Sequence, residues 1–304
     1  MFAGIEIGGT KLQLALGPGH GKLLHLWRGT VDVERGGEGI LDQIKKAYPS
    51  LLKAAKKKPG DIRAIGIGFG GPTDDATRSV VKSHHIAGWE NFPICSHLEA
   101  ELGSPCVLGN DADVAGLAEA TKGAGRGRSP VFYITVGSGI GGGLIVDWAI
   151  YRGVGRGAAE IGHVRPYGEG ILEDYSSGWG IARQYAELSK NARDTKEIVQ
   201  LARRGDRAAR QVIDDATQAL GEAICTVIKL LCPKVIVIGG GVSLMGEDFF
   251  FEPIRRYVVE RGMEAFAGLT EIVPAALGEE VVLHGAIELA RRNVAAGANA
   301  KDPE

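Results

Sequence analysis

The sequence predicts an α/β protein whose sheets are mostly parallel and covered on both faces, and three observations point to it. Short apolar runs such as residues 62–69 are typical of strands that are buried on both faces. These runs alternate with longer segments of helical spacing. A plan of strand, glycine turn and returning strand occurs at the N-terminus and again after residue 130. The repeat predicts two domains, and 304 residues can supply two cores.

The first 122 residues predict an alternation of strands and helices. Apolar β-branched runs indicate the strands, and apolar residues three and four apart indicate the helices. A lysine-rich turn before Pro59-Gly60 is a normal helix end, because cations stabilise a helix C-terminus. We expect strands at 2–7, 12–16, 62–69 and 106–108, helices at 39–58, 93–102 and 112–122, and a domain boundary near 112–122.

The second half of the chain repeats the opening plan. A strand at 131–136, a glycine turn at 137–143 and a returning strand at 144–146 correspond to the N-terminal hairpin. Helical spacing fills residues 181–230. A strand at 235–238, a triple-glycine turn and a closing helix at 283–292 follow, and 295–304 is expected to be frayed.

The composition excludes several classes of protein. A formal net charge of −2 gives no electrostatic reason to bind nucleic acid or an anionic membrane. No apolar stretch approaches the roughly 20 residues of a membrane-spanning helix, and no signal peptide is recognised, so we expect a cytoplasmic protein. The four cysteines form no C-x-x-C pair and are expected to be reduced core residues.

Three clusters among the 46 glycines are candidate phosphate-binding turns. Each follows an apolar strand, and glycine lets the backbone expose several N–H groups to an anion. The clusters are Gly8-Gly9-Thr10-Lys11, residues 137–143 and Gly239-Gly240-Gly241. None matches a P-loop or a Rossmann fingerprint, and each alone is better explained as a hairpin turn. Together, at corresponding positions of two half-chains, they favour a polyphosphate site.

Asp111 follows a strand directly and precedes a helix. In α/β proteins this edge of the sheet is where ligands bind, and a carboxylate there can act as a general base. The alternative is an N-cap for the helix at 112–122, a position that Asp fills well. The residues alone favour the cap, and one side chain can serve both roles.

The motifs resemble a known superfamily. "GIEIGGTK" (4–11) resembles the first phosphate loop of the sugar kinase, actin and heat-shock ATPase superfamily; residues 135–143 resemble its second phosphate loop and 235–241 its adenosine motif. "VGSGIGGG" followed by "YRGVGRGAAEIGH" resembles the ROK family. The resemblance implies a duplicated RNase H-like (actin-like ATPase) fold with two lobes and a cleft between them. The lobes would be 1–112, joined by a C-terminal helix at 287–304, and 113–286.

The same resemblance implies a nucleotide site. Its residues would hold the phosphates of ATP with two glycine turns and the adenosine with the third. The phosphate residues would be Gly8, Gly9, Thr10, Lys11, Gly137, Ser138 and Gly139, and the adenosine residues Gly239, Gly240 and Gly241. Glu6 stands where the superfamily usually has Asp, and would help to hold Mg²⁺ through water.

The resemblance also implies a sugar site. Asp111 matches the family's general base, and Asn110, Glu160, His163 and Glu173 match side chains that contact sugar hydroxyls. Gly70 and Gly71 would line the sugar cleft. His85 lies nearest the position of a sugar-contacting Asn in the family, which puts sugar selectivity in question. Without the resemblance, Glu160 and Glu173 would be interpreted as solvated loop acids and His163 as a partly buried structural residue.

One family feature is missing from the sequence. ROK proteins commonly follow the E-x-G-H motif with C-x-C-G-x-x-G-C, whose cysteines join the histidine around structural zinc. Only nine residues separate His163 from Glu173 here, and none is Cys. Cys225 and Cys232 are seven residues apart on a predicted helix, about 10.5 Å of rise, too far for one zinc ion. We therefore expect no zinc site.

The predicted activity is ATP-dependent phosphorylation of a hexose at its 6-hydroxyl. Glucose is the first choice, an N-acetylhexosamine or fructose the alternatives, and polyphosphate an alternative donor. A sugar sensor without turnover is a rival of another class, but the presence of Asp111 and both phosphate loops opposes it. A sugar-sensing repressor would need a helix-turn-helix segment before Glu6, and we expect none. A homodimer is expected from the family.

Overall fold

The structure is a computed structural model that describes residues 1–83 and 86–299. The chain divides into two compact units. The first comprises Met1–Ala118, Ile150–Ala158 and the residues from Glu279 onward, and the second comprises Glu119–Ala149 and Ala159–Gly278. Relative to the expected lobes, the first unit also takes in 113–118, 150–158 and 279–286. In the described part of the chain, no helix has the length and apolar content needed to cross a membrane.

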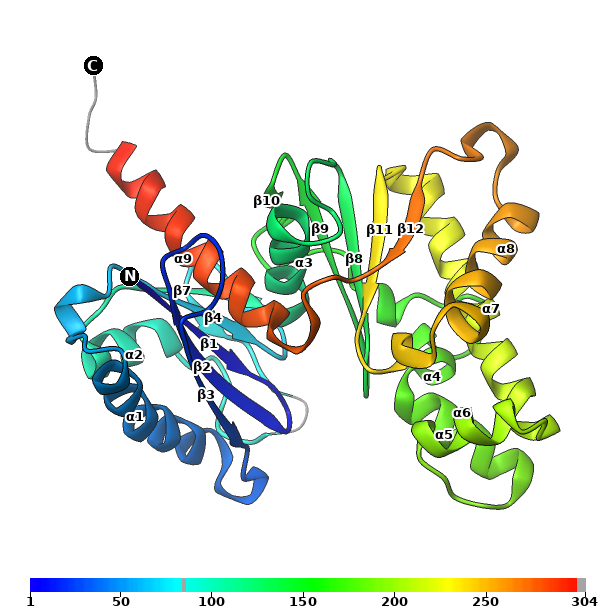
Figure 1. Cartoon of the computed structure of the whole chain (residues 1–304), viewed down its shortest axis with the longest axis horizontal. Coiled ribbons are helices and arrows are strands. Elements are labelled where there is room, and N and C mark those ends of the chain that lie inside the picture. Colours follow the sequence, from blue (N-terminus) through cyan, green and yellow to red (C-terminus); the bar gives the residue numbers. More distant parts are fainter. Residues whose placement is uncertain (84–85, 300–304) are drawn as a thin grey trace. The chain divides into compact units, whose positions relative to one another are not determined.

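The first unit is built on a five-stranded sheet with helices on both faces (Figure 1). β1 and β2 form an antiparallel hairpin, β3 extends it, and β4 and β7 lie parallel to β1. The order is β3-β2-β1-β4-β7, with β1 (Phe2–Ile7), β2 (Lys11–Gly17), β3 (His25–Thr30), β4 (Ile65–Phe69) and β7 (Cys106–Asn110). A two-stranded ribbon of β5 (Thr73–Asp74) and β6 (Ser79–Val80) follows β4.

Strand alternation sends apolar side chains of this sheet to both faces. One face packs with α1 (Gly36–Ala54) and α2 (Ile94–Leu102) in a core that includes Ile5 and Ile67. The other face receives α9 (Val281–Asn299), whose Leu283 and Ile287 are buried with Phe2. α3 (Asp111–Lys122) begins directly after β7. Three of the strands therefore end, parallel, at one edge of the sheet.

The second unit repeats the same strand plan (Figure 1). β8 and β9 form an antiparallel hairpin, and β11 and β12 lie parallel to β8. The order is β10-β9-β8-β11-β12, with β8 (Val131–Val136), β9 (Ile140–Val146), β10 (Ala149–Ile150), β11 (Val235–Gly239) and β12 (Glu271–Pro274). The helices are α4 (Leu172–Ser176), α5 (Gly178–Ser189), α6 (Thr195–Arg203), α7 (Arg207–Leu231) and α8 (Glu252–Arg261). The predicted α/β fold and its duplication are confirmed.

Several predicted boundaries are wrong. The glycine turn expected at 137–143 ends at Gly139, because residues 140–143 pair with β8 as part of β9. The first helix is shifted to Gly36–Ala54 and ends before Lys56, which has a positive φ of 53°. The strand expected at 62–69 begins only at Ile65. β3, α4, α8 and β12 were not predicted at all.

The C-terminal segment is more regular than expected. α9 runs to Asn299, so residues 295–299 are helical and not frayed, whereas 300–304 lie outside the described residues. Alanine-rich sequence has high helix propensity, and the buried N-terminal half of α9 supplies the nucleus for this extension.

Candidate active site

The first glycine turn joins β1 to β2, and Glu6 lies just before it. The backbone N–H of Gly8 donates to the Lys11 carbonyl at 2.9 Å and closes the turn. In the hairpin register Glu6 is opposite Gln13, and both side chains are buried. The Gln13 amide Nε2 donates to Glu6 Oε2 at 2.9 Å, while Lys11 Nζ lies 3.5 Å from Glu6 Oε1.

The electrostatic surroundings of Glu6 suit a divalent cation. Burial raises the pKa of the Glu6 carboxyl, Lys11 and Gln13 oppose that rise, and the negative charge of Glu279 adds to it. The Glu6 carboxylate is held by Gln13 and Lys11, and carboxylate oxygens are donors that Mg²⁺ prefers. The residues present therefore fit the ion that the sequence predicts at this place.

Asn110 and Asp111 stand where β7 passes into α3. The Asn110 Oδ1 accepts from the Ala112 N–H at 2.9 Å, and its Nδ2 donates to the Gly71 carbonyl at 3.1 Å. Asp111 Oδ1 also accepts from Ala112, at 2.8 Å. A Cβ placed on Gly70 would lie 3.3 Å from Asp111 Oδ2. The Asn–Asp pair is thus held against the Gly70-Gly71 turn.

The first glycine turn is adjacent to this group. The backbone N–H of Gly70 donates to the Ile7 carbonyl at 2.8 Å, one residue before Gly8. The carboxyl ends of β1, β4 and β7 consequently bring the predicted phosphate turn, sugar-lining turn and base together within the first unit. His85, the remaining predicted sugar residue of this part of the chain, lies outside the described residues.

In the second unit, the Gly137–Gly139 turn is fixed to the start of α5. The backbone N–H of Gly178 donates to the Gly137 carbonyl at 2.7 Å, and Trp179 donates to the Ser138 carbonyl at 3.4 Å. Glu173 approaches the same turn, because its Oε2 accepts from the Ile140 N–H at 2.7 Å. A predicted sugar residue and a predicted phosphate turn are therefore joined by a hydrogen bond.

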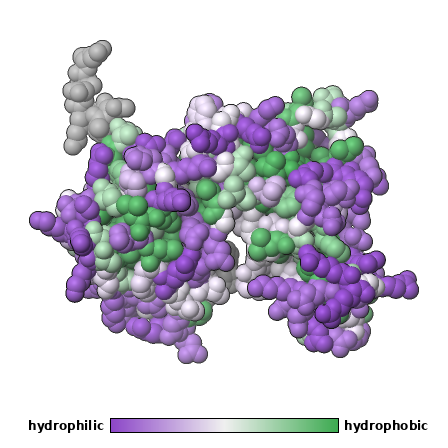
Figure 2. Space-filling model, viewed as in Figure 1, coloured by the Kyte–Doolittle hydropathy of each residue, from purple (hydrophilic) through white to green (hydrophobic). Residues whose placement is uncertain are grey.

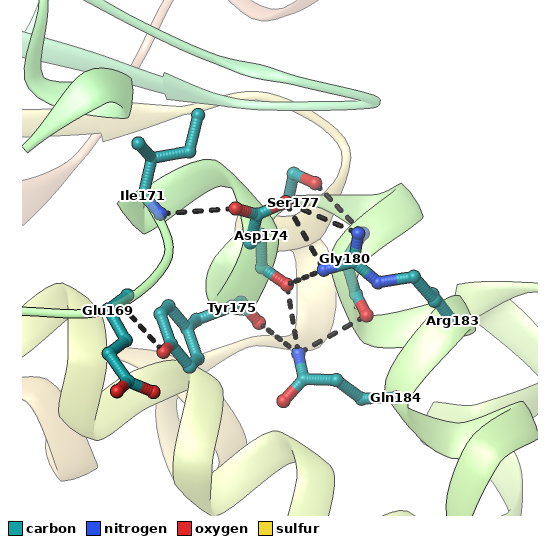
Figure 3. Close-up of polar contacts among 8 residues, drawn as sticks. All are labelled: Glu169, Ile171, Asp174, Tyr175, Ser177, Gly180, Arg183 and Gln184. Atoms are coloured by element: carbon teal, nitrogen blue, oxygen red, sulfur yellow. Dashed lines mark hydrogen bonds and ion pairs between the residues drawn. The ribbon is translucent and has the colours of Figure 1, made fainter. Parts of the chain in front are cut away.

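A polar network that includes Asp174 and Gln184 holds α4 and α5 in place (Figure 3). Asp174 Oδ2 accepts from the Ile171 N–H at 3.1 Å, which together with Arg183 lowers the pKa of Asp174. Ser177 Oγ caps α5 by accepting from the Gly180 N–H at 2.9 Å. The Gln184 amide donates to the carbonyls of Asp174, Tyr175 and Gly180. These bonds fix the backbone on both sides of Glu173.

Glu160 precedes a short 3₁₀ turn at Ile161–His163, and His163 is its last residue. Their side chains are 63% and 66% exposed, and His163 Nδ1 lies 3.9 Å from Glu160 Oε2. Buried Ile161 anchors the turn in the core of the second unit. Two exposed polar side chains on an anchored turn are available to hydroxyl groups. The exposure of His163 does not support the alternative that it is a partly buried structural residue.

The third glycine turn follows β11. Gly239 is the last residue of that strand and pairs with Thr135 of β8, so this turn and the Gly137–Gly139 turn leave neighbouring parallel strands at the same edge. Gly240 has φ +89°, and Ser243 Oγ donates to its carbonyl at 2.7 Å. The turn therefore has a defined conformation beside the second phosphate turn.

Sequence reasoning missed Gln13. The signal was available, because a lone amide interrupts the apolar run of β2, and a hairpin closed by Gly8–Lys11 places it opposite Glu6. Because the rest of the strand is apolar, the sequence was interpreted as a buried strand and Gln13 was not considered as a functional residue.

The duplicated strand plan, with glycine turns and polar side chains at the ends of parallel strands, defines the actin-like ATPase class to which sugar kinases belong. Among solved structures, the chain is similar to a ROK hexokinase from Thermus thermophilus, with 30% identity, a TM-score of 0.83, and coverage of 97% of this chain and 99% of that one. It is also similar to a ROK family glucokinase from Streptomyces griseus in complex with glucose and AMPPNP, with 29% identity, a TM-score of 0.81, and coverage of 96% and 99%.

A curated relative gives the same picture. A glucokinase of Halalkalibacterium halodurans is 31% identical over 308 residues, which are 93% of this chain and 93% of the relative. The ROK family model matches residues 2–293. The chain belongs to the ROK family.

Proposed function

We propose that this protein is an ATP-dependent hexose kinase that phosphorylates the 6-hydroxyl of its sugar, with glucose as the preferred substrate. The observation that carries the proposal is the grouping in the first unit of Asp111, the Gly70-Gly71 turn and the first glycine turn. A carboxylate beside a candidate phosphate turn is what phosphoryl transfer to an alcohol requires. The glucose and AMPPNP in the Streptomyces griseus complex support both substrates.

In the proposed reaction, Asp111 accepts the proton of the sugar hydroxyl. The hydroxyl oxygen forms a bond to the γ-phosphorus of ATP, the bond from that phosphorus to the bridging oxygen breaks, and ADP leaves. The proton then passes from Asp111 to solvent. Asn110 cannot replace the base, because a carboxamide does not accept a proton near neutral pH; its oxygen caps α3 and its nitrogen donates to Gly71.

The remaining roles divide between recognition of the sugar and recognition of the nucleotide. Glu160, His163 and Glu173 orient the sugar, since a carboxylate can accept from two vicinal hydroxyls. Glu173 has one oxygen committed to Ile140, so Oε1 is the atom that it offers. The three glycine turns hold the phosphates and the adenosine as the sequence predicts.

Glu6 is the residue that would hold Mg²⁺ through water. When bound, the ion neutralises charge on the phosphate oxygens. Lys11, 3.5 Å from Glu6 Oε1, supplies a second positive charge at the same turn. A homodimer is part of the proposal and rests on the family alone.

A coupled ADP-release assay over glucose, mannose, fructose and N-acetylated hexosamines tests the function. We expect turnover with ATP and the highest kcat/KM with glucose. Higher kcat/KM for an acetylated sugar or fructose would change the substrate. Sugar binding with no ADP release for any sugar would replace the kinase by a sensor.

A further inference from the structure

Gln13 has no place in the proposed reaction, yet it is a fully buried amide in the middle of a strand. A buried amide is costly unless its polar atoms are paired. Both are paired here: Nε2 donates to Glu6 Oε2 at 2.9 Å, and Oε1 accepts from Arg28 Nε at 3.0 Å. The side chain therefore links a buried carboxylate to an arginine on the next strand.

The arginine fixes which way the amide points. Arg28 can only donate, so the oxygen of Gln13 must face it, and the nitrogen must then face Glu6. Arg28 is itself anchored by a hydrogen bond and ion pair to Glu280, just before α9. Its side chain is about half exposed, at 52%, so its anchoring can be altered without opening the core.

The fixed amide of Gln13 restricts the orientation of the Glu6 carboxylate. A glutamate side chain has three rotatable bonds, and ordering it costs conformational entropy. The amide of Gln13 holds Oε2, which leaves Oε1, near Lys11, as the oxygen that faces the glycine turn. A reversed amide would set two oxygen acceptors against each other, so the network selects one orientation of the carboxylate.

We propose that Gln13, oriented by Arg28 and Glu280, is the positioning residue that presents Glu6 to the water shell of a divalent cation. The inference rests on the proposed function, because it gives Glu6 the role of the cation's acid. Residues that orient the ligands of a metal typically change its affinity by about 10–100-fold when they are lost.

The test measures the Kd for Mn²⁺ of the protein in the presence of AMPPNP. Electron paramagnetic resonance gives the concentration of the unbound ion. Gln13→Met keeps the side-chain length and removes both hydrogen bonds. We expect its Kd for Mn²⁺ to rise, by less than the roughly 10–100-fold that follows loss of a residue bonded to a direct metal ligand, while its Kd for glucose is unchanged. Arg28→Met, on the exposed part of the network, should raise the Mn²⁺ Kd less and carries the test if Gln13→Met does not fold. Gln43→Met makes the same change on α1, where the amide donates to Thr30, and should match the wild type.

Three results would overturn the proposal. In the first, the wild type binds Mn²⁺ and the folded variants have the same Mn²⁺ Kd. That result would exclude the positioning role of Gln13 and leave the kinase proposal intact. A parallel loss of Mn²⁺ and glucose affinity would make Gln13 a structural residue. If the wild type itself binds no Mn²⁺ with AMPPNP, the nucleotide site of the proposed function fails, and this inference fails with it.

Discussion

At the scale of single residues, two roles meet at the start of α3: capping of the helix and acceptance of a proton. The sequence could not separate these two roles at Asp111. The sequence allowed Asp111 to be an N-cap, a base, or both. In the structure the Ala112 N–H is shared, at 2.9 Å from Asn110 Oδ1 and 2.8 Å from Asp111 Oδ1. Since Asn110 also caps the helix, the carboxylate of Asp111 is not needed to satisfy that donor. This division makes a clean test of the base possible.

Asp111→Asn should lower kcat by about 10²–10⁴-fold, the usual effect of losing a general base. The melting temperature should stay nearly constant, because the amide oxygen can still accept from Ala112. Steady-state kinetics and thermal denaturation measure both quantities. As a control, Asn110→Ala should destabilise the fold by about 0.5–2 kcal/mol, the cost of a lost cap. Wild-type kcat in Asp111→Asn would remove Asp111 from the chemistry.

At the scale of elements, the second glycine turn differs most from its sequence-based description. Residues 140–143 belong to β9, and the turn is only Gly137–Gly139. Glu173 approaches so closely that a Cβ on Gly139 would lie 2.5 Å from its Oε2. A side chain at Gly139 must therefore displace Glu173, the proposed sugar residue, and would also obstruct the proposed phosphate site. Gly137 is different, because the nearest atom to an added Cβ is 3.9 Å away.

Gly137→Ala should weaken AMPPNP binding by about tenfold or more, equivalent to roughly 1.4 kcal/mol, and leave the glucose Kd unchanged. The methyl group has room in the protein alone, so the loss would report on a phosphate that approaches the backbone. Gly139→Val is the matched variant and should weaken both ligands. Calorimetric titration with each ligand separates them. Unchanged nucleotide affinity in Gly137→Ala would argue against a phosphate contact at this turn.

A buried carboxylate at the end of α3 ties two connections together. Glu119 is fully buried, its Oε2 accepts from the Ala124 N–H at 2.7 Å, and its Oε1 accepts from Ala276 and Leu277 at 2.9 and 2.8 Å. The same side chain thus fixes the loop after α3 and the segment between β12 and α9. All of these atoms belong to the second unit.

Glu119→Ala should destabilise the protein by about 1.5–3 kcal/mol, because three partly buried backbone donors lose a charged acceptor. Urea denaturation measures the change in the free energy of unfolding. Glu187→Ala, an exposed position on α5, is the control and should alter stability by less than about 0.5 kcal/mol. A loss no larger than that of the control would mean that the three donors find other acceptors.

Most of the strands that the sequence predicts have apolar runs that pass through the centre of a sheet, such as β1, β8 and β11. β3 and β12 are sheet edges with exposed polar residues, so periodicity alone does not reveal them. The short α4 has one local support, since Asp174 Oδ2 accepts from the Ile171 N–H three residues earlier, but the support from Gln184 comes from the next helix and is not read from the local sequence. Sequence motifs indicated most of the residues of the candidate site. The Gln13–Arg28 network could not be found in this way, because it depends on which residues the strand register places opposite each other.

At the scale of the whole molecule, the hydropathy of the surface is relevant to assembly. The burial of the cysteines is relevant to metal content. The face shown in Figure 2 is mostly hydrophilic with smaller apolar areas on each unit, and Val259 and Met263 are among the exposed apolar residues of the second unit. Burial raises the pKa of the Cys95 thiol to about 11, and also raises that of Cys225. Both are free cysteines buried in the protein.

We predict that the purified protein carries no stoichiometric zinc and that His163 serves the sugar alone. Within residues 1–83 and 86–299, no group of three or more His, Cys, Asp or Glu is placed to hold a metal ion. A strong zinc chelator should leave the melting temperature and glucose Kd unchanged, while His163→Ala should weaken glucose binding without loss of stability, since its side chain is 66% exposed. One tightly held zinc per chain in elemental analysis would contradict this.

The central claim is transfer of the γ-phosphoryl group of ATP to a hexose 6-hydroxyl with Asp111 as base. The most direct measurement is ³¹P and ¹³C nuclear magnetic resonance of the products formed from ¹³C-glucose, ATP and Mg²⁺. The account predicts a phosphomonoester on carbon 6, formed together with ADP in equal amounts, and formation of that product about 10²–10⁴-fold more slowly with Asp111→Asn. Release of inorganic phosphate without a sugar phosphate, a phosphate on another carbon, or equal product from Asp111→Asn would contradict it.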